Sequence, residues 1–208
     1  MNNQEKQEHI KSKIIDSIFE LLSSKRLEDM TADEIAKMAQ VSKRTLYKYY
    51  KSKKEMYLAI VRNAFMDLSK KIYIELTTIN QDDPWYQIEC IGREYMRYCI
   101  DNPIKAKLIL GYDETEYVLK YPGWVSDIQD YSNKFELVPF IQKYYDYHDV
   151  EPPKQIPSIA LYLWAEAQGM ATLLMFKGEW IKEYYKLDQE QLIEEHLQLS
   201  KKVLGEKR

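Results

Sequence analysis

The chain has few residues that break helices or form cross-links. Its 208 residues include only 6 glycines, 7 prolines and 2 cysteines. We also find no convincing alternation of apolar and polar residues, which is the pattern that predicts half-buried strands. The scarcity of turn residues, together with the lack of strand patterns, predicts an all-α fold.

The two cysteines do not point to a disulfide. Cys90 and Cys99 lie nine residues apart in a helical pattern. Nine steps of about 100° place them on opposite faces of one helix, so they cannot bridge within it. We expect both to be small core residues in a reducing cytoplasm.

Long uninterrupted apolar runs are also missing. Residues 1–13 hold no apolar stretch, so we expect no signal peptide. The longest apolar run, residues 156–176, is interrupted by Glu166, Gln168 and Gly169. Because a carboxylate near the centre of a lone membrane span is costly, this run predicts a buried helix of a soluble, cytoplasmic protein with no membrane partner.

The residues that usually carry catalysis are scattered. The three histidines are His9, His148 and His196, and no cluster has metal-ligand spacing. There is no glycine-rich phosphate loop and no nucleophile motif. The sequence therefore predicts neither an enzyme nor a metal or cofactor site.

Charge is present and unevenly spread. The net charge is -3, yet residues 1–57 hold 12 Lys and Arg against 9 Asp and Glu, a balance of +3. Residues 58–208 hold 18 against 24, a balance of -6. A basic head on an acidic body is typical of a protein that contacts a polyanion with one end.

The basic charge concentrates in residues 42–54. This window holds six Lys or Arg residues, four leucine or tyrosine residues and no acid. It follows residues 31–41, which predict a short helix and a tight turn. Two short helices with a basic second member are typical of a helix-turn-helix, whose second helix enters the DNA major groove.

Start signals mark the helices of this region. Thr31 and Glu34 form a capping box, Ser42 is an N-cap, and Ser52 and Glu55 form a second box. Apolar spacing extends the pattern over the rest of the chain. The expected helices span residues 7–24, 31–39, 42–49, 52–76, 82–101, 104–110, 124–147, 158–176 and 188–204.

At these positions the sequence resembles a known family. The string Ile35-Ala36-x-x-Ala39-x-Val41-Ser42-Lys43-x-Thr45-Leu46-Tyr47-x-Tyr49-Tyr50-x-Ser52-Lys53 is similar to that of the TetR (tetracycline-repressor-type) transcriptional regulators. The resemblance is specific across residues 10–62. It implies an all-α fold with a three-helix helix-turn-helix head, residues 1–52, on a helical-bundle body for ligand binding and dimerisation, residues 53–208.

The sequence departs from the family at several positions, of which Gln40 matters most to the geometry. The family usually has glycine there. If the turn needs a left-handed residue, a non-glycine at this position costs on the order of 1 kcal/mol, which packing can absorb. The departures leave the basic face intact and change the expected target sequence.

The resemblance implies a set of DNA-contacting residues. Arg44 and Lys43 fall in the first turn of the second helix, where an arginine can bind guanine bidentately. Tyr47, Tyr49 and Lys53 suit phosphates. A basic run alone more often forms a solvated face, but the helix-turn-helix spacing favours DNA. The expected DNA-binding residues are Thr31, Ser42, Lys43, Arg44, Thr45, Tyr47, Lys48, Tyr49 and Lys53.

The body is rich in aromatic residues, among them most of the 18 tyrosines. Aromatics at helical spacing are usually core, but they can also line an apolar pocket. The carboxylates of Glu94 and Glu166 can pair with a cationic ligand. Glu166 can equally pair across a dimer or face water. The expected ligand-binding residues are Tyr95, Tyr98, Tyr121, Trp124, Phe135, Trp164, Glu166 and Met170.

The apolar helix at residues 158–176 needs cover on most sides. The helix at 188–204 can cover one side, and a symmetric partner can cover another, with Ala165 and Gly169 allowing close approach. We therefore expect a homodimer through these two helices. Its two heads would bind a pseudo-palindromic operator with half-sites about 34–36 Å apart.

Together these patterns predict a sequence-specific repressor that leaves its operator when a small apolar or aromatic ligand binds the body. Two alternatives stay open. The regulator can be controlled by a protein partner in place of a small molecule, or it can organise DNA without sequence preference.

Overall fold

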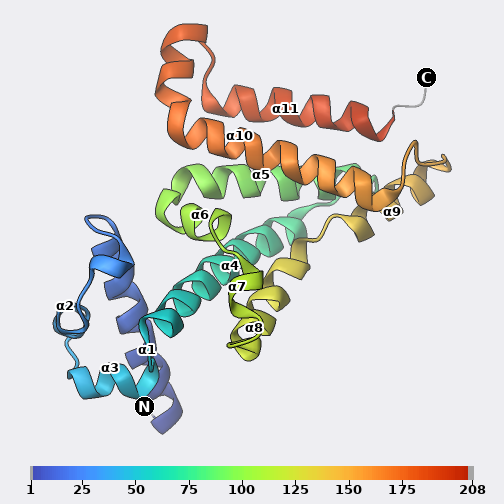
Figure 1. Cartoon of the computed structure of the whole chain (residues 1–208). Helices are drawn as coiled ribbons and strands as arrows, with labels where there is room; N and C mark the ends of the chain where they lie inside the picture. The colour runs from blue at the N-terminus through green and yellow to red at the C-terminus, as the bar shows by residue number, and fades with distance from the viewer. Residues whose placement is uncertain (1, 206–208) are drawn as a thin grey trace. The chain divides into compact units, whose positions relative to one another are not determined.

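The computed structural model describes residues 2–205, and every regular element in that range is a helix (Figure 1). The all-α prediction is therefore confirmed. The helices form two compact units. The first unit holds the described residues up to Phe65 together with Lys107–Gln129, and the second holds Met66–Ala106 and the described residues from Asp130 onward.

The first unit contains the predicted three-helix head, and it also includes a segment from later in the chain. A boundary between head and body at residues 52 and 53 divides the chain by function, so it stays a prediction. The elements of this unit are α1 (Asn3–Leu22), the short 3-10 helix η1 (Leu27–Asp29), α2 (Ala32–Met38), α3 (Lys43–Tyr49), the first half of α4 (Lys53–Thr78), the end of α6 (Pro103–Leu110), α7 (Glu114–Tyr117) and most of α8 (Pro122–Ser132).

Side-chain caps begin the helices of the head. The Glu34 N–H donates to Thr31 Oγ1 at 3.2 Å and the Thr31 N–H donates to Glu34 Oε2 at 2.8 Å, which completes the predicted capping box of α2. Ser42 caps α3 by accepting from the Thr45 N–H at 3.0 Å. At the start of α4, the Glu55 N–H donates to Ser52 at 3.2 Å. The Glu55 carboxylate, however, accepts from the Lys51 N–H, one residue earlier than a capping box requires.

The turn between α2 and α3 is a complete Schellman motif. The Val41 N–H donates to the Ala36 carbonyl at 2.9 Å, and the Gln40 N–H donates to the Lys37 carbonyl at 3.2 Å. Gln40 has a φ of 54°, in the left-handed region. The turn therefore does require a left-handed residue, and here glutamine adopts that conformation where the family usually has glycine.

A continuous apolar core fastens the helices of the head. Ile14 and Ile18 of α1, Ile35 of α2, Leu46 of α3 and Ile60 of α4 are each fully buried in one cluster. Full burial of such a side chain contributes about 1.5–3 kcal/mol. Ile14 and Ile18 are four residues apart, a spacing that places both on one face of α1.

The second unit is built around three helices that lie against one another. Helices α10 and α11 run side by side in opposite directions, and α5 packs against both (Figure 1). The elements of the second unit are the second half of α4, α5 (Trp85–Asp101), the start of α6, the end of α8, the short 3-10 helix η2 (Asn133–Phe135), α9 (Val138–His148), α10 (Ile156–Tyr185) and α11 (Gln189–Leu204).

The single long helix predicted over residues 124–147 is wrong. The chain forms α8, then η2, and then begins α9 at Val138. Pro139 lies in the first turn of α9. Proline lacks a backbone N–H, so it is tolerated in a first turn but breaks the hydrogen bonding of a helix interior. The same rule applies at Pro122, which begins α8 where a break was expected.

Helix α10 is longer than predicted and is covered on only part of its surface. It has 30 residues, and Leu161, Trp164 and Phe176 are each more than half exposed. Among the described helices, α10 alone is long and apolar enough to cross a membrane, judged by length and composition, and 33% of its most apolar window is buried. The core helix of a soluble protein meets the same criterion, so this observation is weak evidence for a span.

Replacing Gln40 with glycine is expected to stabilise the head. Gln40→Gly removes the Cβ that makes the left-handed conformation unfavourable, so the free energy of unfolding rises by about 1 kcal/mol. Equilibrium urea unfolding followed by circular dichroism measures it. Gln40→Ala is the matched control, because it shortens the side chain but keeps the Cβ. Equal stability of the glycine and alanine variants would contradict the role given to this turn.

Candidate nucleic-acid interface

Helix α3 has a buried face and a basic exposed face. Leu46 is 0% exposed and packs in the core that α1, α2 and α4 share. Lys43, Arg44 and Lys48 are exposed, and Tyr47 is 43% exposed. The burial of Leu46 sets the rotation of the helix about its axis. The basic residues must therefore face solvent on one side of the first unit.

Two neighbouring cations in the first turn of α3 have different surroundings. Lys43 Nζ lies 2.9 Å from Asp33 Oδ2 of α2, and this hydrogen bond raises the pKa of the Lys43 ammonium. Arg44 is exposed and makes no ion pair or hydrogen bond with the described residues. Its guanidinium therefore keeps all its donors for an external acceptor.

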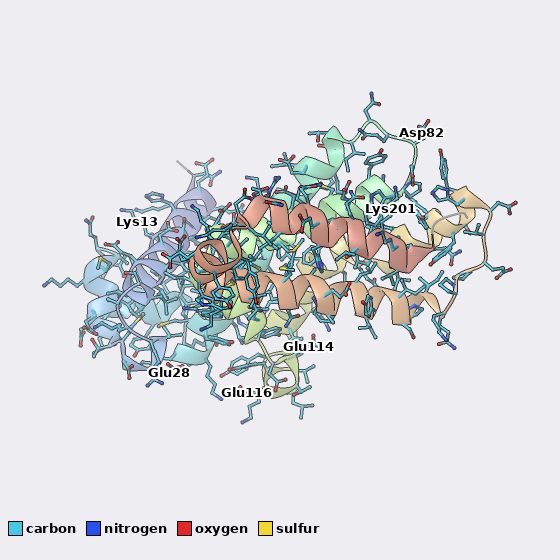
Figure 2. All side chains as sticks on the ribbon, turned by 90° about the horizontal axis from the view of Figure 1, so that it is seen from above. Lys13, Glu28, Asp82, Glu114, Glu116 and Lys201 are labelled. Atoms are coloured by element: carbon cyan, nitrogen blue, oxygen red, sulfur yellow. The ribbon has the colours of Figure 1, made fainter. Side chains whose placement is uncertain are left out.

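The other predicted DNA-binding residues surround this helix. Lys48 Nζ lies 5.7 Å from the ring centre of Tyr49, which is partly buried. The hydroxyls of Ser42 and Thr45 are 2.8 Å apart and satisfy each other. Lys53 Nζ donates to the backbone carbonyl of Glu28 at 2.8 Å, which links the start of α4 to η1; Glu28 is labelled in Figure 2.

The start of α2 is stabilised by charge as well as by its cap. Glu34 accepts hydrogen bonds from Lys25 and from the backbone and hydroxyl of Thr31. The bond from Lys25 is the largest cause that lowers the pKa of Glu34 to about 2, and the bonds from Thr31 add to it. The Thr31 N–H is thus already occupied, so a phosphate at this helix end would compete with Glu34.

The predicted ligand-binding residues are divided between the two units. Tyr121 and Trp124 belong to the first unit, where Trp124 lies 6.4 Å from Tyr50 between ring centres. The second unit holds the others: Tyr95, Tyr98, Phe135, Trp164, Glu166 and Met170. Two of these are clearly core, because Tyr95 is 7% and Tyr98 1% exposed. Trp164 is the opposite case, with 54% exposure on the surface of α10.

Neither candidate carboxylate is left without a partner. Glu94 is buried, but it lies 3.5 Å from Lys71 Nζ and 3.3 Å from the Arg97 guanidinium. Glu166 accepts a hydrogen bond of 2.5 Å from the Tyr162 hydroxyl, one helical turn away. A cationic ligand would have to displace these partners, so the two residues are weaker ligand candidates than the sequence indicated.

An aromatic cluster in the first unit is larger than the sequence predicted. Tyr112 and Tyr117 stack with ring centres 6.2 Å apart, and Phe65 and Tyr57 of α4 pack edgewise or tilted against them. Tyr121 lies 6.5 Å from Tyr117 between ring centres. Tyr117 and Tyr121 are only four positions apart in the chain, so their contact is local. Nothing in the sequence places Tyr57 and Phe65 beside them.

One polar atom in this aromatic cluster has no partner. The Tyr112 hydroxyl is buried and makes no hydrogen bond with the described residues. A buried, unsatisfied hydroxyl costs about 1–3 kcal/mol relative to a paired one. Such a group calls for a water molecule or a ligand atom as its partner. The cation of Lys54 lies 5.8 Å from the ring centre of Tyr117, beside Glu116 of α7 (labelled in Figure 2).

The described residues offer little for redox or metal chemistry. Cys90 and Cys99 are both buried and free, as predicted, and burial raises the pKa of each thiol to about 11. A thiol that stays protonated at neutral pH is a poor nucleophile. Among residues 2–205, no group of three His, Cys, Asp or Glu side chains is placed to hold a metal ion.

The first unit thus defines a helix-turn-helix protein, with an exposed basic helix carried on a buried core. Residues 14–60 match the profile of the bacterial regulatory proteins of the tetR family. This match covers the head alone, and there the chain is similar to the TetR family, as the resemblance of residues 10–62 implied.

The curated relatives include biofilm regulators of staphylococci. The biofilm operon icaADBC negative transcriptional regulator IcaR of Staphylococcus epidermidis is 32% identical over 92 residues, or 44% of this chain and 46% of that protein. IcaR of Staphylococcus aureus is 27% identical over 149 residues, or 70% of this chain and 75% of that protein. The first match thus spans about half of the relative's length.

Solved structures share the fold. FadR from Bacillus subtilis, in complex with stearoyl-CoA, has a TM-score of 0.67 at 13% identity and covers 91% of this chain and 96% of its own. AibR, in complex with isovaleryl coenzyme A and operator DNA, has a TM-score of 0.62 at 16% identity, with 91% and 97% covered. At such low identity the likeness establishes the fold alone.

The charge of Glu34 is expected to stabilise the head only above acidic pH. Its pKa is about 2 in the folded chain and about 4.3 in an unfolded one. This stabilisation is therefore present above the unfolded pKa and is lost as the pH falls through the folded pKa. Glu34→Gln keeps a capping side chain without the charge. Urea unfolding should show a gap between wild type and variant at pH 6 that closes as the pH falls towards 2.

The control for this experiment is Glu20→Gln, which removes an exposed carboxylate from α1. It measures how much any surface carboxylate contributes over the same pH range. A wild-type and Glu34→Gln gap that stays constant with pH would contradict the stabilising charge.

Proposed function

We propose that the chain is a repressor that binds a pseudo-palindromic operator as a homodimer. The observation that carries this proposal is the exposed, basic face of α3, held outward by the burial of Leu46. A short helix with this polarity, following a tight turn after α2, has the geometry that enters a major groove. The similarity to IcaR, a negative transcriptional regulator, supports repression as the outcome.

Within this surface the residues take different roles. Arg44 has the free guanidinium that a guanine edge requires for two parallel hydrogen bonds. Tyr47 and Lys48 are exposed on the same helix and suit phosphates, as does Lys53 beside η1. Base contacts then set the preferred sequence, while phosphate contacts set affinity and register.

The exposed side of α10 supports a homodimer. Leu161, Trp164, Leu173 and Phe176 are 59%, 54%, 46% and 58% exposed. A Cβ added at Gly169 would meet nothing within 4 Å, so the helix surface is open there. Neighbouring exposed apolar side chains are typical of an association site. A second copy of α10 and α11 would cover it and bring two heads to half-sites about 34–36 Å apart.

The regulating signal in this proposal is a small apolar or aromatic molecule. The aromatic cluster of Tyr57, Phe65, Tyr112, Tyr117 and Tyr121 supports it, because the unpaired Tyr112 hydroxyl can hydrogen-bond a ligand's polar group. The fold is also that of FadR with stearoyl-CoA and AibR with isovaleryl coenzyme A. Acyl thioesters are thus reasonable first probes.

Ligand and DNA must then oppose each other. A ligand that prefers a conformation unsuited to the operator weakens DNA binding, and DNA weakens ligand binding by the same factor. Helix α4 has residues in both units, and in this proposal it carries the effect of the ligand to the head. A ligand that binds tightly and leaves DNA affinity unchanged would contradict this mechanism for that ligand.

Arg44→Ala is expected to abolish the preference for operator over scrambled DNA. Loss of a bidentate base contact lowers operator affinity by about 5- to 150-fold. Lys53→Ala, in contrast, should weaken binding to both DNAs equally. It should also lower the slope of log affinity against log salt concentration by about one. The measurement is a salt series of binding to the DNA upstream of the gene and to a scrambled fragment.

The control is Lys154→Ala, which removes one positive charge from an exposed loop of the second unit. It should leave both affinities within about twofold. Wild-type binding that is equal on both fragments would refute a sequence-specific regulator that acts on this DNA.

Two changes on α10 are expected to convert the dimer to monomers. Leu173→Glu places a charge on the exposed apolar face, and Gly169→Leu adds bulk where a second helix would approach. Sedimentation velocity measures the outcome, and circular dichroism checks that the helices are kept. Leu119→Glu is the matched control, because Leu119 is 92% exposed but lies in the first unit. Variants that sediment like wild type would exclude this face as the interface.

A further inference from the structure

The first turn of α3 carries two adjacent cations, and only one of them is committed within the protein. Lys43 is paired with Asp33 at 2.9 Å, across the turn between α2 and α3. Arg44 makes no such contact with the described residues. Sequence reasoning gave the two residues the same role because they are neighbours and both basic.

We propose that Asp33 is an internal counterion that competes with DNA for Lys43. The Asp33 carboxylate holds the Lys43 ammonium against α2. Arg44 is then the first-turn cation available to base edges, and Lys43 does not make a sequence-independent contact with a DNA phosphate. This inference rests on the proposed function of α3 as a DNA-binding helix.

Among the acidic residues near the start of α2, Asp33 is the one available to act as the counterion of Lys43. Glu34, its neighbour, is occupied by Thr31 and Lys25. Asp29 pairs with Arg26 within η1 and its flank, at 3.1 Å. The Asp33 side chain is 72% exposed and reaches across the turn to the neighbouring helix. A pair this exposed is weakly held, so a DNA phosphate can compete for the lysine.

The competition has a direct electrostatic consequence. Sequence-independent affinity for DNA grows with each phosphate that a Lys or Arg side chain neutralises, and each such contact releases about one counterion. While Lys43 stays with Asp33, it contributes little to that count. Removing the Asp33 carboxylate frees one cation at the centre of the interface and also removes a negative charge that faces the DNA.

The test separates these two effects with a double-mutant cycle. Wild type, Asp33→Ala, Lys43→Ala and the double variant are titrated with scrambled DNA over a salt series, and in parallel with the upstream fragment. We expect Asp33→Ala to bind scrambled DNA up to about fivefold more tightly. The slope of its log affinity against log salt concentration should be steeper by about one. In the Lys43→Ala background, the same Asp33→Ala change should alter affinity by less than about twofold.

Asp29→Ala is the matched control. It makes the same charge change and frees Arg26 from an ion pair that is also exposed. If freeing any surface cation were enough, this variant would gain affinity as Asp33→Ala does, and that result would overturn the proposal.

Other outcomes are equally decisive. An Asp33→Ala gain that persists without Lys43 would mean that Asp33 only repels phosphates, and a loss of affinity for both DNAs would mean that it is structural. Either result overturns the internal counterion. The proposed function is judged separately, by the wild-type preference for the upstream fragment, because the counterion is measured on scrambled DNA.

Discussion

The burial of one side chain, Leu46, governs the rest of the DNA-binding surface. Helix α3 has only seven residues and cannot be stable by itself, since short helices rely on tertiary packing. Its attachment to the apolar core of α1, α2 and α4 supplies that packing. Once Leu46 faces inward, the helical period directs Arg44, Tyr47 and Lys48 outward. The core thus determines both that the helix exists and which residues it presents.

The turn before α3 controls its direction, and it does so with a strained residue. The left-handed Gln40 ends α2 and lets Val41 close the Schellman motif. Ser42 then begins α3 within two residues. A head assembled from such short elements tolerates little error in the turn. This explains why local strain is accepted here, where the surrounding core overdetermines the conformation.

Much of the fold was predictable because its signals are local. Caps at Thr31, Ser42 and Asp188 depend on residues within three positions, and apolar spacing identified the inner faces. The prediction was wrong over residues 124–147, where apolar periodicity was given more weight than Pro139. The ligand-binding residues stay a prediction, because aromatic composition identifies residue types but not which of them meet after folding.

The sequence by itself determined the helical class, the helix-turn-helix and the basic character of α3, since these follow from short-range patterns and from charge. The tertiary structure alone decided which partners within the protein the basic residues contact. The pairing of Lys43 with Asp33 and the contact of Lys53 with Glu28 join residues 10 and 25 positions apart. The tertiary structure also brings Tyr57 beside Tyr117, through packing that no local pattern encodes. Contacts of this kind depend on how the helices cross, and the crossing is set by the whole core.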